Sequence, residues 1–288
     1  MRGKKLGLTF FWIFLVIAAL FLWTETAEKK AHYTPEYERV DLRPFLEKTV
    51  LSEEDYTTIF CQTGLTRVGV DELYEEGRQA ELLYLQQRFF APVEYECCQV
   101  NIFCRSERLT GEGQWETVGQ QASCRFLPTV RTGDILVTFS GHVFGWRSGH
   151  AGIVVDGDAG LTLEAINLGC NSELCDLKNW EDYPSVALLR LRNSTEKETE
   201  AIAAYAEEYL ADIPYDLASF ADRRGTAAEE SAGEEREALS GTQCAHLVWS
   251  AFYAFGYDLD SDGGFVVTPA DLYESELLEV VQIYGIRP

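Results

Sequence analysis

One cysteine and one histidine have the types and settings that thiol chemistry requires. Cys244 stands at the start of an apolar helical segment, residues 240–249, and His150 opens a short strand-like segment, residues 149–155. The thiolate is the nucleophilic form of cysteine, and the positive end of a helix favours it. A neighbouring imidazole supplies the base that such a nucleophile needs. We therefore expect Cys244 to act as a nucleophile and His150 as its base.

The segment around Cys244 is predicted to be a buried helix. Ser240 and Gln243 match a capping box, which would place Cys244 in the first helical turn. The apolar residues that follow have helical spacing and predict a core-facing stripe: Leu247, Val248, Ala251, Phe252 and Phe255. A cysteine at the edge of such a stripe is, taken alone, more often a small core residue than a nucleophile. The assignment therefore depends on its partners.

A third group should orient the imidazole, and Glu164 is the first candidate. It is the carboxylate of an otherwise apolar strand segment, residues 161–166, and a buried carboxylate needs a partner. If Asp156 pairs with Leu161 across the turn at 157–160, Asn167 lies roughly opposite His150 and Glu164 a short step inward. We expect Glu164 to hold the imidazole, with Asn167 as the alternative.

The other three histidines are weaker candidates for the base. His32 lies close to the N-terminal apolar segment. His246 follows Cys244 by two positions, which points it to the opposite side of a helix. His142, in the predicted loop at 140–146, remains an alternative base.

Composition and the N-terminus limit the class of protein. A net charge of −23 argues against nucleic-acid binding, which requires clustered Lys and Arg. Residues 1–27 combine a basic start with an apolar run at 6–23, and this predicts a membrane anchor or a signal peptide. The charge bias places everything after about residue 24 outside the membrane. The protein is therefore expected on the extracytoplasmic side of the cell membrane, or secreted if the segment is cleaved.

Eight cysteines in an exported chain predict disulfides, with Cys170 and Cys175 close enough to close one loop. Cys244 must stay outside any bridge if it is a nucleophile. We expect no metal or cofactor, because the cysteine cluster has no neighbouring histidine and no pair of CxxC motifs. Residues 258–263 match the start of a calcium loop, but Pro269 occupies its twelfth position, so an acidic turn is favoured there.

The chain divides into three predicted parts. Residues 1–27 form the anchor, and residues 28–128 a mostly helical, cysteine-containing region with helical periodicity at 68–74 and 80–90. Residues 129–288 form the catalytic domain. Within it, residues 222–241 are acidic and predicted to be disordered. Four segments are predicted as strands, 134–139, 151–156, 161–166 and 186–191, and a capping box at 195–198 as the start of a helix.

Several short motifs together resemble a known family. In order they are Gly-Asp-Ile-Leu at 133–136, Gly-His-Ala-Gly-Ile-Val at 149–154, Leu-Glu-Ala at 163–165, Pro-Tyr-Asp at 214–216, Gln-Cys-Ala-His-Leu-Val-Trp at 243–249 and Thr-Pro-Ala-Asp-Leu at 268–272. This pattern resembles the YiiX-like group, in the circularly permuted, NlpC-type branch of papain-like thiol hydrolases. The resemblance implies Cys244 as nucleophile, His150 as base and Glu164 as orienting residue. Gln243, where the family pattern suggests an aromatic residue, and Ala245, where serine is common, depart from it.

The resulting expectation is an α+β fold, a permuted papain-like antiparallel sheet packed on the Cys244 helix and preceded by the helical region. The expected activity is hydrolysis of an amide bond outside the membrane, with cell-wall peptide as the leading substrate. One alternative is an acyl-lipid hydrolase or acyltransferase, which a deep apolar groove lined by Trp146 or Trp249 would favour. Another is a ligand-binding module in which Cys244 is inert. The sequence does not indicate an oligomeric state.

Overall fold

The computed structural model describes residues 12, 15, 16, 19, 31–101, 104–110, 127–143, 145–219 and 239–288. The predicted anchor at 1–27 and the predicted acidic loop at 222–241 lie almost entirely outside these residues. Within them, no helix is both long enough and apolar enough to cross a bilayer.

The centre of the molecule is a six-stranded sheet in the order β10-β9-β3-β6-β7-β8, in which all neighbours run antiparallel. Its strands are β3 (Ile135–Thr138), β6 (His150–Asp156), β7 (Leu161–Glu164), β8 (Glu173–Asp176), β9 (Val186–Leu191) and β10 (Leu278–Tyr284). The four strands predicted from the sequence correspond to β3, β6, β7 and β9. Every residue of β9 is buried, because both faces of the sheet are covered.

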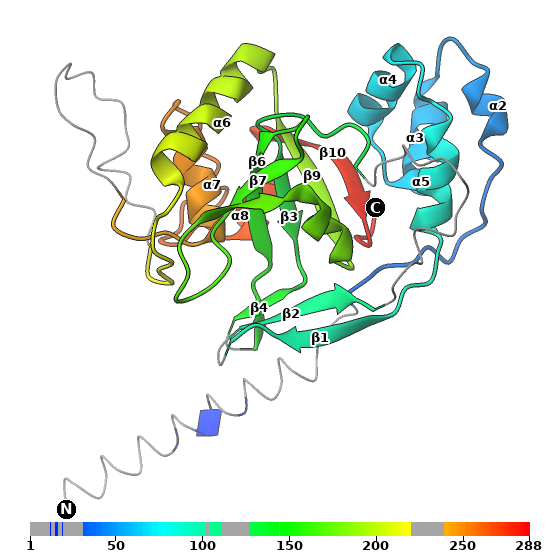
Figure 1. Ribbon diagram of the computed structural model, residues 1–288. Helices are drawn as coiled ribbons and strands as arrows, with labels where there is room; N and C mark the ends of the chain where they lie inside the picture. The colour runs from blue at the N-terminus through cyan, green and yellow to red at the C-terminus, as the bar shows by residue number, and fades with distance from the viewer. Residues whose placement is uncertain are drawn as a thin grey trace, which may run out of the picture.

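One face of the sheet packs against helices, as Figure 1 shows for α6 (Glu196–Leu210) and α7 (Cys244–Tyr253). Ala151, Ile153 and Val155 of β6 share one core with residues of both helices. Since side chains alternate along a strand, Val154 faces the other way, into a second core with Trp180. The short helix α8 (Pro269–Glu274) lies close to α7, β3 and β10. The α+β prediction, with an antiparallel sheet packed on the Cys244 helix, is confirmed.

A helical layer precedes the sheet, as predicted. It contains α2 (Arg43–Leu46), α3 (Glu53–Thr63), α4 (Arg67–Glu75) and α5 (Glu81–Phe89), which enclose their own apolar core. A β-bridge between Leu65 and Gln282 joins this layer to β10. The helical layer and the sheet are therefore in direct contact.

A second sheet was not predicted from the sequence, and two of its strands lie in the region predicted to be mostly helical. The hairpin β1 (Tyr95–Gln99) and β2 (Cys104–Leu109) continues through β4 (Gly141–Val143) to β5 (Trp146–Arg147), in the order β1-β2-β4-β5. Both strands of the hairpin are rich in polar residues and β1 is largely exposed, so they carry no regular apolar alternation. This sheet brings the N-terminal region next to the loop that leads to His150.

Two local predictions differ from the structure. No disulfide joins any two of the seven cysteines in the described part of the chain, and Cys170 and Cys175 in particular are not paired. Thr195 is the N-cap of α6, but its side chain makes no capping hydrogen bond. Its backbone oxygen instead accepts from the backbone N–H groups of Glu198 and Thr199, which is sufficient to begin the helix.

Candidate active site

Cys244 is the first residue of α7, and Gln243 positions it. Gln243 is the N-cap: its side-chain oxygen accepts a hydrogen bond from the Ala245 backbone at 2.9 Å, and its amide nitrogen donates to the Val267 carbonyl at 2.7 Å. The predicted capping box with Ser240 was therefore wrong, because Gln243 caps the helix itself. Cys244 is only 7% exposed, and its thiol lies 3.5 Å from the Gln243 side-chain oxygen. The nucleophile candidate thus lies in the first turn, as expected.

His150 is the first residue of β6, and the glycine before it allows the backbone to turn into the strand. Gly149 has a φ of +79°, a conformation that side chains disfavour, and a Cβ there would lie 2.4 Å from the Thr138 carbonyl oxygen. His150 pairs with Thr138 across the sheet. Its Nε2 lies 2.6 Å from Oε2 of Glu164. The structure therefore joins the predicted base to the predicted orienting carboxylate.

A β-bulge explains why Glu164 reaches His150. Asp156 pairs with Leu161 as predicted, but the register then shifts between Val154 and Asp156, so that Ile153 pairs with Leu163. A shift of one residue moves every side chain to the other face of the sheet. It brings Glu164 beside Gly152, whose added Cβ would lie 2.9 Å from the Glu164 Cγ. Glu164 and His150 consequently share one face.

The same shift moves Asn167 away from the position expected for it. Its side-chain oxygen accepts a hydrogen bond from the Asn101 amide, in the turn between β1 and β2. Asn101 also binds the backbone N–H of Cys104 at 2.8 Å. Among the contacts described for His150, Glu164 occupies the position for which Asn167 was the alternative.

The electrostatics of the pair favour a charged imidazole beside a charged carboxylate. Burial lowers the pKa of His150, but Tyr183, Cys244 and Glu164 outweigh it and raise that pKa well above the ordinary value of 6.5. Burial raises the pKa of Glu164, but its hydrogen bond to His150 and the charge of that ring outweigh burial, and the pKa falls below its ordinary value. Hydrogen bonds to the ionised form of a group favour that form.

The Cys244 thiol lies close enough to the same imidazole to contribute to the rise in its pKa. Because Nε2 of His150 already faces Glu164, Nδ1 is the ring nitrogen left for the sulfur. The structure thus brings together all three residues singled out from the sequence, in the order Cys244, His150, Glu164. A thiol, an imidazole and a carboxylate in this order can perform nucleophilic chemistry.

Several residues near this group were not found by sequence reasoning. Trp180 stacks on His150 and donates its indole N–H to Glu164 at 2.9 Å, and Tyr183 lies 6.3 Å from the His150 ring centroid. Cys104 of β2 and Tyr215 are also close. Burial first, and the nearby Cys244 in addition, raise the pKa of both. These residues come from three separate segments of the chain, so no local sequence motif indicates them.

The remaining histidines are engaged elsewhere. His32 Nδ1 meets the Pro184 carbonyl, and His246 Nδ1 lies 3.0 Å from the Thr242 hydroxyl. His142, the alternative base, lies on β4 with its Nε2 3.4 Å from Glu107.

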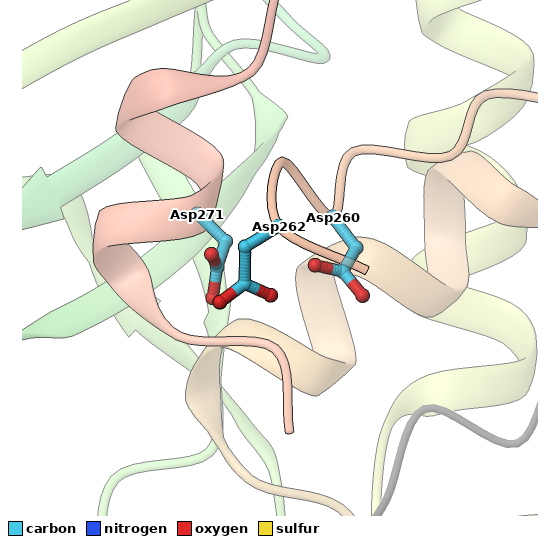
Figure 2. A group of neighbouring side chains, drawn as sticks. All are labelled: Asp260, Asp262 and Asp271. Carbon is cyan, nitrogen blue, oxygen red and sulfur yellow. The ribbon is translucent and has the colours of Figure 1, made fainter. Parts of the chain in front are cut away.

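Three carboxylates form a separate acidic group, shown in Figure 2. Asp260, Asp262 and Asp271 have carboxylate oxygens within 4.8 Å of one another, an arrangement that could hold a metal ion. The sequence indicated the first two but not Asp271, which comes from α8 in place of the twelfth loop position. Each carboxylate accepts hydrogen bonds within its own turn or cap, and Asp271 also accepts one from Ser261.

Comparisons with known proteins give little further information. No family model matches the chain, and no curated protein matches it. One solved structure, the metalloprotein yiiX from Escherichia coli O157:H7, aligns with 14% identity over 52% of this chain and 96% of that chain, at a TM-score of 0.37. At this TM-score, the similarity says nothing about the reaction of this chain.

Proposed function

We propose that this protein is a thiol hydrolase that cleaves an amide bond through Cys244, His150 and Glu164. The observation that carries the proposal is the 2.6 Å contact between His150 Nε2 and Glu164 Oε2, on a ring that also interacts with the Cys244 thiol. The order of the elements supports a permuted papain-like interpretation of the sheet, since the histidine and acidic strands precede the cysteine helix. The sequence resemblance to the YiiX-like group points the same way.

The proposed reaction has two steps. The Cys244 thiolate attacks the substrate carbonyl carbon, and the His150 imidazolium protonates the leaving amine as the C–N bond breaks. Water then attacks the thioester with His150 as base, which releases the carboxylic acid and restores the thiol. Glu164 keeps the ring oriented and stabilises its charged form. The Cys244 backbone N–H, in the first turn of α7, can donate to the developing oxyanion.

We further propose an extracytoplasmic location and cell-wall peptide as the substrate, on the basis of the N-terminal segment and the family resemblance. A deep apolar groove lined by Trp146 or Trp249 would favour the acyl-lipid alternative. Trp249 is fully buried and donates to Asp258 at 2.9 Å, so it cannot line a groove, whereas Trp146 is 61% exposed. Peptide amides are therefore the first choice, with acyl esters as the second.

Alkylation of Cys244 tests the proposal without a known substrate. Wild-type protein and the His150→Ala and Cys244→Ala variants are treated with iodoacetamide at mildly acidic pH, and the Cys244 peptide is quantified by mass spectrometry. We expect rapid labelling of the wild type and a loss of about 100-fold in His150→Ala. Cys170, which is exposed, provides an internal reference thiol. Equal labelling of Cys244 in wild type and His150→Ala would favour a ligand-binding module instead.

Substrate class is tested on the same proteins. Cell-wall peptides and long-chain acyl esters are supplied in parallel, and the mass of trapped acyl-enzyme is measured. An adduct on Cys244 from the peptide supports the amidase proposal. An adduct formed only from the acyl ester would replace it with the lipid alternative.

A further inference from the structure

Trp180 contacts both partners of the His150–Glu164 pair, although it lies on neither of their strands. It belongs to the short 3-10 helix η1 (Leu177–Asp182), between β8 and β9, and is fully buried. Its indole N–H donates to Glu164 Oε1 at 2.9 Å. Its ring stacks on the His150 imidazole with 5.4 Å between centroids and 13° between planes. One side chain thus touches the carboxylate and the base at once.

The two oxygens of Glu164 have separate partners. Oε2 faces His150 at 2.6 Å, while Oε1 accepts from Trp180 and from the Thr162 hydroxyl at 2.9 and 2.6 Å. A carboxylate that receives donors on both oxygens is held in one orientation and in its ionised form. Rotation of the carboxylate would break three contacts together. Trp180 and Thr162 therefore hold the Glu164 carboxylate in the orientation in which one oxygen faces the imidazole.

The backbone is shaped to admit this arrangement. A Cβ on Gly152 would lie 2.9 Å from the Glu164 Cγ and 3.1 Å from the Trp180 Cζ2. A side chain there would push the carboxylate and the indole away from β6. On its other side, the indole packs among buried apolar residues that include Val154 and Leu188. Its position is therefore set by the core rather than by the site alone.

The stack has an electrostatic consequence for the ring of His150. The face of an indole attracts positive charge, and this attraction is strongest where water is excluded. Both rings are buried, so the imidazolium gains more from the contact than the neutral imidazole does. In the described part of the chain, the other titratable groups that face the pair are Cys244 on α7, Cys175 on β8 and Tyr183 after η1.

We propose that Trp180 is the positioning residue of this site: its N–H fixes Glu164 as an ionised carboxylate, and its face supports the imidazolium of His150. The inference rests on the proposed function, because it assigns Trp180 to the support of that reaction. Trp180 does not contact the nucleophile in the described interactions, so its effect is exerted through the pair.

The test is the pH profile of Cys244 alkylation by iodoacetamide. Trp180→Phe keeps an aromatic face but removes the donor, so Glu164 should become protonated at a higher pH. The acid limb of the profile should then move up by about half to one pH unit, the equivalent of one lost hydrogen bond. Thr162→Val removes the second donor to the same oxygen and should move the limb in the same direction. It also decides the matter if Trp180→Phe does not fold.

The chain contains a matched control. Trp249 is also fully buried, donates to a carboxylate, Asp258, at 2.9 Å, and lies 5.6 Å from a histidine ring, His246. Trp249→Phe should lower stability as Trp180→Phe does, yet leave the acid limb where it is in the wild type. If wild-type Cys244 is reactive but the acid limb of the pH profile stays at its wild-type position in both Trp180→Phe and Thr162→Val, the role of Trp180 is overturned and the proposed function is not. A wild-type Cys244 that is unreactive at every pH overturns the proposed function and this inference with it.

Discussion

Two buried charge clusters lie on the six-stranded sheet, and they differ in the cation at their centre. One joins Arg190 of β9 to Asp134, with contacts of 2.7 Å to each carboxylate oxygen, and to Glu72 of α4. The other joins His150 to Glu164. Arginine stays protonated at all relevant pH values, whereas histidine exchanges its proton near neutrality. Burial of an ion pair is therefore common to both clusters, and only the second can take part in proton transfer.

Their neighbours differ as well. Arg190 also donates to the Thr129 carbonyl and, through Glu72, links the sheet to the helical layer. Burial lowers the pKa of Arg190, but Asp134 and Glu72 outweigh burial and raise that pKa above its ordinary value. No described contact of this cluster involves a thiol. His150 interacts with Cys244, on a helix that begins at that residue. We therefore expect the first cluster to serve stability and the second to serve the proposed reaction.

The largest effect is expected from a substitution that breaks the first cluster, the one around Arg190. Arg190→Met leaves Asp134 and Glu72 buried without their main cation, and removal of one member of a buried pair costs about 3–5 kcal/mol. Urea unfolding should show this loss, while Cys244 alkylation in the folded fraction stays at the wild-type rate. Arg67→Met, which removes the exposed pair with Glu53, should change stability little. A large drop in alkylation at unchanged stability would reverse the assignment.

Next in size is Glu164→Gln, which removes the charge but keeps the shape. Without the carboxylate, the imidazolium of His150 loses the charged partner of its Nε2, and Cys244 reactivity should fall about 100-fold. The measurement is the alkylation rate at mildly acidic pH. Glu107→Gln is the matched control, because Glu107 is also buried and lies 3.4 Å from a histidine, His142. Equal losses in the two variants would mean that the effect is structural.

The third prediction compares how the two clusters depend on pH. Because the pKa of Glu164 is lowered in the folded state, its stabilisation is present above the unfolded value of about 4.3 and is lost as pH falls through the folded pKa. Because the pKa of His150 is raised, its stabilisation is complete below the unfolded value of about 6.5 and is lost as pH rises through the folded pKa.

Free energies of unfolding measured at a series of pH values test these two pH dependences. The difference between wild type and Glu164→Gln should shrink toward acid, and the difference between wild type and His150→Gln should shrink toward alkali. The difference for Arg190→Met should stay constant on the alkaline side, where its guanidinium remains charged. A constant His150→Gln difference up to high pH would contradict the raised pKa.

Local sequence patterns identified the parts of the site that local structure determines. Glycine before His150, the apolar strand around Glu164 and the helix start at Cys244 were each recognisable within a few residues. Gln243 was misread because its amide binds Val267, a contact 24 residues away that no capping pattern encodes. Trp180 was missed for the same reason, since a six-residue 3-10 helix has no periodic signature and its partners lie on other strands.

The smallest predicted effect concerns Asn167, the alternative orienting residue. The bulge between Val154 and Asp156 shifts the strand register by one residue from the expected one. As a result Glu164 lies beside His150, and Asn167 accepts a hydrogen bond from Asn101 instead. Asn167→Ala should therefore change Cys244 alkylation by less than about threefold, as substitutions outside a site do. Asn101→Ala should act alike, because it removes the same hydrogen bond. If Asn167→Ala instead matched Glu164→Gln, the register without the bulge would be the functional one, and Glu164 would lose its role.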